Sequence, residues 1–69
     1  MRLMTATTEI TLVEGGRYRV EGEARDVEQR ILAAARGSIM ELAWMIEAGT
    51  GERFAINPEC VVALRGVSS

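Results

Sequence analysis

The amino-acid sequence predicts an α+β fold in which two β-hairpins flank one α-helix and build an antiparallel sheet, in the order ββαββ. Three observations support this prediction. The chain has 69 residues, which suffices for one small domain. Two segments alternate apolar and polar residues around glycine-bearing loops, as β-hairpins do. The segment between them is rich in strong helix formers. We place the domain at residues 9–66, after a flexible lead-in over 1–8 and before a tail over 67–69.

The first hairpin is expected over residues 9–22. Its two strands are separated by Glu14-Gly15-Gly16, and glycine adopts the backbone angles of a tight turn at little steric cost. Alternation places one set of apolar side chains on a common face, namely Ile10, Leu12, Tyr18 and Val20.

The helix is expected over residues 24–36. An apolar stripe recurs at helical spacing and consists of Val27, Ile31, Ala34 and Ala35. Gly37 follows as a stop signal. The start of the helix has no Ser, Thr or Asn to cap it, so its N-cap is weak.

The segment over residues 38–48 is ambiguous between strand and helix. Ser38 and Glu41 would form a capping box if it were a helix. We predict a strand, because residues 53–56 alternate in the way expected of its hairpin partner. A turn or bulge over residues 57–59 and a final strand over 60–64 complete the fold.

The two hairpins also share a short pattern. Residues 17–23 and 53–59 both read Arg, aromatic, any residue, β-branched, any residue, turn residue, Glu. This places Tyr18 and Phe54 at equivalent positions. Either the two hairpins use the same strand and turn chemistry, or one hairpin was duplicated.

The composition excludes several classes of function. The chain has no His, so the commonest metal ligand and general base is absent. The one cysteine, Cys60, can neither close an intramolecular disulfide nor complete a Cys-rich zinc site, and its valine neighbours favour a packing role. We therefore expect a protein that is not an enzyme and holds no metal or cofactor. The unpaired cysteine, and the lack of a secretory signal or a long apolar run, indicate a cytoplasmic protein without a membrane partner.

The strand over residues 38–48 predicts an interaction with another chain. It is apolar on both faces, and one helix cannot cover both faces of a small sheet. The second face, or a sheet edge, is therefore expected to meet another chain, most simply a second copy and alternatively a different protein. The residues assigned to this interaction are Ile39, Ala43, Trp44 and Met45. The main functional prediction is a small protein–protein interaction or regulatory module that forms a homo-oligomer.

Two alternative functions remain open. Arg17, Arg19 and Arg53 fall at outward positions and could contact an anion or a nucleic acid, or they could form a solvated face with Glu9 and Glu21 as cross-strand partners. The net charge of −2 argues against bulk electrostatic binding to nucleic acid. The other alternative is an oligomer that binds a small ligand in a pocket near Trp44.

A family resemblance agrees with this architecture. Residues 40–64 resemble the flagellar FlbD-like family, in which a strand, a glycine-containing turn and an aromatic-containing strand precede an Asn-x-x-x-[Ile/Val] turn and a final strand. Residues 51–61, GERFAINPECV, occupy that pattern. Residues 10–36 look like the family's other half, so the two halves occur here in reversed order. That order is similar to a family of small, uncharacterised actinobacterial proteins. The resemblance implies a small bacterial domain of this fold and carries no catalytic residue.

Overall fold

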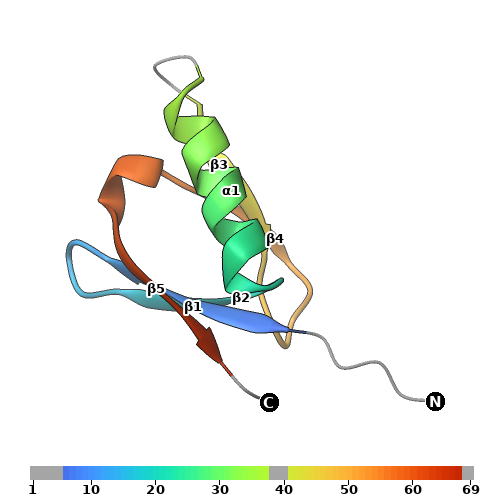
Figure 1. Cartoon of the computed structure of the whole chain (residues 1–69). Helices are drawn as coiled ribbons and strands as arrows, with labels where there is room; N and C mark the ends of the chain where they lie inside the picture. The colour runs from blue at the N-terminus through green and yellow to red at the C-terminus, as the bar shows by residue number, and fades with distance from the viewer. Residues whose placement is uncertain (1–5, 38–40, 68–69) are drawn as a thin grey trace.

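The computed structural model describes residues 6–37 and 41–67 and has an α+β fold (Figure 1). These residues form five strands in two antiparallel sheets and one α-helix, together with a short 3-10 turn, η1. The elements are β1 (Thr7–Leu12), β2 (Arg17–Glu21), α1 (Ala24–Ala35), β3 (Ala43–Ile46), β4 (Arg53–Ile56), η1 (Pro58–Cys60) and β5 (Val61–Val67).

The first hairpin is confirmed. β1 and β2 pair antiparallel, with Ile10 opposite Tyr18. The turn closes through two backbone hydrogen bonds of 2.8 Å, from the N–H of Leu12 to the carbonyl of Gly16 and from the N–H of Gly15 to the carbonyl of Leu12. Gly15 has φ of 98°, a left-handed conformation that glycine adopts without a steric penalty. Glycine is therefore found in this turn because the backbone there must adopt a positive φ.

β5 extends the first sheet, whose strand order is β2-β1-β5. It pairs with β1 so that Leu64 lies opposite Ile10. Two predicted boundaries are wrong. The final strand runs to Val67, so residue 67 belongs to β5 rather than to a tail, and Thr7 and Thr8 belong to β1 rather than to a lead-in. Pairing with β5 and β2 on both sides of β1 accounts for the longer strands. Residues 1–5 and 68–69 lie outside the described residues.

The helix is confirmed almost to the residue, since α1 ends at Ala35. Its N-cap, Glu23, makes no side-chain capping hydrogen bond, as the sequence indicated. Val27, Ile31 and Ala34 are buried, but Ala35 is exposed, and its predicted place in the apolar stripe is wrong. At about 100° per residue, Ala35 lies about 80° around the helix from Val27, beyond the edge of the packed face.

The second hairpin is confirmed as β3 paired with β4, with Met45 opposite Phe54. The helical alternative for this segment is excluded over residues 43–46, while residues 38–40 lie outside the described part of the chain. An isolated antiparallel bridge between Val20 and Glu47 connects the two sheets.

The predicted turn over residues 57–59 forms the start of η1. The Oδ1 atom of Asn57 accepts a hydrogen bond of 2.9 Å from the N–H of Glu59 and caps this turn. Cys60 ends η1 instead of starting the final strand, so the predicted beginning of that strand is one residue early.

The core lies between α1 and the inner faces of both sheets, and Figure 1 shows α1 lying across β3 and above β1, β2 and β5. Its buried apolar residues are Ile10, Leu12, Val20, Val27, Ile31, Ala34, Ala43, Met45 and Ile56. One polar residue, Thr8, is buried with them, and its hydroxyl donates a hydrogen bond of 2.9 Å to the carbonyl of Gly22. The helix therefore packs against the inner faces of both sheets and covers the core between them.

Gly22, which links β2 to α1, provides a first testable prediction. Its φ is 120°, where an L-residue is strained, although a Cβ there would be at an ordinary distance of 3.5 Å from Cγ2 of Val27. Gly22→Ala is expected to lower the free energy of unfolding by about 1 kcal/mol, measured by urea denaturation. The control is Gly66→Ala, where the new Cβ would lie 4.0 Å from Ala24 and φ lies outside the left-handed range. Equal losses for the two variants would contradict the backbone explanation.

Candidate interaction surface and open cavity

Trp44 lies on the outer face of the second hairpin. The antiparallel register pairs Trp44 with Ala55 and Ile46 with Arg53, on the side opposite the core. Trp44 is 55% exposed and Leu42 is 43% exposed. The guanidinium carbon of Arg53 lies 5.3 Å from the centroid of the Trp44 ring, within cation–π range. We call this surface the Trp44 face and define it as Leu42, Trp44, Ile46, Arg53 and Ala55.

The four residues predicted for interaction do not all lie on the surface. Trp44 is on the surface, as expected. Ala43 and Met45 are 2% and 1% exposed and belong to the core, so assigning them to an interaction surface was wrong. Their side of β3 is covered by α1 and the first sheet, which leaves only the alternate residues exposed. Ile39 lies outside the described residues.

The predicted arginine patch is divided between the two sheets. Arg17 and Arg19 lie on β2, whereas Arg53 lies on β4 over Trp44. Arg19 has Glu9 as its cross-strand neighbour, and its Nε atom lies 3.9 Å from Oε2 of Glu9. The interpretation as a solvated face with Glu9 as cross-strand partner therefore applies to Arg19.

Arg65 also lies on the outer face of the first sheet, beside Glu9 and Arg19, and the sequence analysis did not identify it. Its Nη2 atom donates to Oε1 of Glu9 at 3.1 Å. The Glu9 side chain is 12% exposed, while those of Arg19 and Arg65 are 63% and 75% exposed. One largely buried carboxylate thus lies between two exposed guanidinium groups. Only the pairing of β5 with β1 brings Arg65 here, so no local signal could have identified it.

Glu9→Gln provides a second prediction. Removing the carboxylate leaves Arg19 and Arg65 as like charges on either side of β1, and the loss in stability is expected to be about 1 kcal/mol or less because both arginines are well solvated. Urea denaturation should show a larger loss at low than at high salt, since salt screens this repulsion. A loss that does not change with salt would mean that Glu9 acts through packing alone. Thr11→Val on the same outer face of β1 is the uncharged control.

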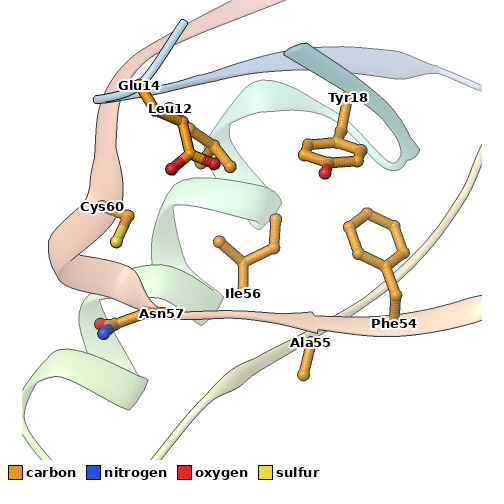
Figure 2. A pocket seen from close by; sticks show the side chains of 8 residues that line it. All are labelled: Leu12, Glu14, Tyr18, Phe54, Ala55, Ile56, Asn57 and Cys60. Atoms are coloured by element: carbon orange, nitrogen blue, oxygen red, sulfur yellow. The ribbon is translucent and has the colours of Figure 1, made fainter. Parts of the chain in front are cut away.

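An open cavity of about 160 Å³ lies where the first turn, β4 and η1 meet (Figure 2). Its lining consists of Leu12, Glu14, Tyr18, Phe54, Ala55, Ile56, Asn57 and Cys60. The rings of Tyr18 and Phe54 form one wall, with their centroids 5.3 Å apart and their planes tilted by 40°. Figure 2 shows Ile56 at the centre and the sulfur of Cys60 on the side opposite the two rings.

The sequence pointed to this cavity only indirectly. The shared pattern of the two hairpins placed Tyr18 and Phe54 at equivalent positions, and the structure brings these two rings into contact. The remaining lining comes from segments whose proximity depends on the tertiary fold. Trp44 is not part of the lining, so this cavity differs from the ligand pocket predicted near that residue.

The described residues contain no group of three or more His, Cys, Asp or Glu side chains arranged to hold a metal ion. In the same part of the chain, no helix has the length and apolar character needed to cross a membrane.

Comparison with known proteins finds no match for this chain among family models, curated proteins or solved structures. The resemblance to the FlbD-like family and to the small actinobacterial family therefore stays a prediction.

Proposed function

We propose that this protein is a small, non-enzymatic protein–protein interaction module of the bacterial cytoplasm that self-associates through the Trp44 face. The observation that supports this proposal is the 55% exposure of Trp44 on a strand whose opposite face already fills the core. Tryptophan and arginine are the residue types most enriched at the energetic centres of protein interfaces. Trp44 and Arg53 stack here as a pre-ordered pair beside apolar Leu42 and Ile46.

A second copy is the partner that we favour. A domain of this size buries too little apolar surface to be very stable alone, and association adds buried area. In a two-fold dimer the same patch contacts itself, so the Trp44 face of one copy would cover the Trp44 face of the other. This places the large aromatic side chain at the centre of the contact and the polar ends of the hairpin at its rim.

Sedimentation velocity over a range of concentrations tests this proposal. The wild-type protein is expected to associate, and Trp44→Glu is expected to be monomeric with an unchanged circular dichroism spectrum, because a charge in a buried contact is costly. The matched control is Val62→Glu on β5, another strongly exposed apolar residue (60%), located on the other sheet. It should leave the association intact.

Two results would overturn the proposal. A wild-type protein that stays monomeric at all concentrations would exclude self-association. Dissociation by Val62→Glu but not by Trp44→Glu would place the contact at the edge of β5. Native mass spectrometry of the protein captured from its host would show whether a different protein is bound instead, and loss of that protein in Trp44→Glu would place it on the Trp44 face.

Nucleic-acid binding is the second candidate function. The observation that favours it is the addition of Arg65 to Arg17 and Arg19 on the outer face of the first sheet. The carboxylate of Glu9 offsets part of this positive charge and weakens the case. Binding to a fluorescent single-stranded oligonucleotide should fall steeply with salt if this function holds, and should be weaker in Arg17→Ala. Absence of binding at low salt would exclude it.

A further inference from the structure

We propose that the open cavity between the first turn, β4 and η1 binds a small organic amine whose body is a single aromatic ring. This inference does not rest on the proposed self-association, because Trp44 does not line the cavity, and Ala55 is the one residue that the Trp44 face and the lining share.

The volume limits the ligand to one ring. At about 160 Å³, the cavity is close in size to an apolar cavity of about 150 Å³ that accommodates benzene. It is too small for a peptide segment or a dinucleotide. Because it is open to solvent, a substituent on the ring could extend outward without displacing the core.

The walls suit a flat apolar body. Leu12 and Ile56 are buried core residues that form an aliphatic floor. Tyr18 is 40% exposed, and its ring and that of Phe54 are tilted against each other at one side of the cavity. An aromatic ligand could meet these rings edge to face, the arrangement that the aromatic quadrupole favours. The Cys60 thiol closes the opposite side as a small, polarizable surface.

The carboxylate of Glu14 favours a cationic ligand. Figure 2 shows the carboxylate of Glu14 turned toward the interior of the cavity. Within residues 6–37 and 41–67, this carboxylate has no hydrogen bond or ion pair. The amide of Asn57 is directed away from the cavity, and its Oδ1 atom accepts a hydrogen bond from the N–H of Glu59. The Tyr18 hydroxyl and the Cys60 thiol are neutral, so the one charged group of the lining is the carboxylate of Glu14, which an ammonium group meets best.

Titration with benzylamine, followed by two-dimensional ¹H–¹⁵N NMR of the whole chain, tests this proposal. Saturable shifts are expected at the amides of Tyr18, Phe54 and Cys60, with a Kd on the order of 1 mM, as befits a ligand of so few atoms. Toluene tests the ring without the charge, and benzoate tests the opposite charge. Both should bind more weakly than benzylamine.

Four variants sharpen the test. Glu14→Gln should weaken benzylamine binding about three- to fivefold and leave toluene binding unchanged, because the lost ion pair is solvent-exposed. Cys60→Leu should abolish binding by filling the cavity. The matched control is Ala63→Leu, because Ala63 is an exposed residue of β5 that does not line the cavity. It should bind as the wild type does, and so should Trp44→Glu, which separates this site from the self-association surface.

Any of three results would overturn the proposal. The first is the absence of saturable shifts with benzylamine. The second is benzylamine binding that Cys60→Leu and Glu14→Gln both leave unchanged. The third is equal affinity for benzylamine, toluene and benzoate, which would show that the carboxylate selects nothing. Should Cys60→Leu fail to fold, the comparison of Glu14→Gln with wild type across the three ligands decides the question.

Discussion

Replacing Met45 with alanine is expected to lower the free energy of unfolding by about 2–5 kcal/mol. Met45 is 1% exposed and is among the largest fully buried side chains. Its removal leaves a cavity in the core between α1 and the two sheets. Because a domain of this size is held by only about 3–5 kcal/mol, Met45→Ala should remove most of its stability at 25 °C. Circular dichroism with urea denaturation measures this directly.

The control for this prediction is the preceding residue. Trp44→Ala removes a larger side chain, yet it should cost only about 1 kcal/mol or less in the monomer, because Trp44 is 55% exposed and loses mainly its contact with Arg53. The two variants should therefore differ strongly in stability, and in the opposite sense to the size of the side chain removed. Comparable stabilities would mean that the faces of β3 are assigned incorrectly.

Replacing Thr8 with valine is expected to cost about 1–3 kcal/mol, although the two side chains have nearly the same shape. The Thr8 residue is fully buried, and its hydroxyl donates to the carbonyl of Gly22 at 2.9 Å. Valine leaves that carbonyl without this donor, and the cost of an unsatisfied acceptor exceeds the gain from a more apolar core. The hydrogen bond also ties β1 to the junction between β2 and α1, where Gly22 has φ of 120°.

Thr11→Val is the matched control for Thr8→Val. Thr11 lies on the same strand but on its outer face, opposite Arg17. There, valine suits the strand at least as well as threonine, so stability should change by less than about 0.5 kcal/mol. If urea denaturation shows Thr8→Val to be as stable as the wild type, the bond to Gly22 contributes nothing net.

Elements with local signals were predictable from the sequence. The turn at Gly15 and the helix over 24–35 depend on glycine conformation and on helical spacing, both visible within a short window. The strand β3 was harder, because the helical propensity of its residues points the other way. It was identified through its partner β4, which shows that tertiary pairing outweighs local propensity here.

Features that depend on distant residues could not be predicted in the same way. Nothing local indicates that β5 pairs with β1, and Arg65 was therefore not connected with Glu9. The sequence also did not show which face of β3 points inward, because Met45 and Trp44 are both apolar and alternation alone does not tell which one faces the helix. The cavity was missed for the same reason, since its lining comes from two distant parts of the chain, residues 12–18 and 54–60.

The position of β1 between β2 and β5 has a consequence for the order in which the protein can fold. The ion pair between Glu9 and Arg65 joins residues 56 positions apart, which marks β1–β5 as a pairing of high contact order. During synthesis, β1 is made early and can pair with β2 as soon as β2 follows. Its other edge can pair with β5 only after the helix, the second hairpin and η1 have all been made. The central strand of the sheet is thus among the first parts to be synthesised and the last to be completed. Throughout that interval its free edge is open to pairing with other chains.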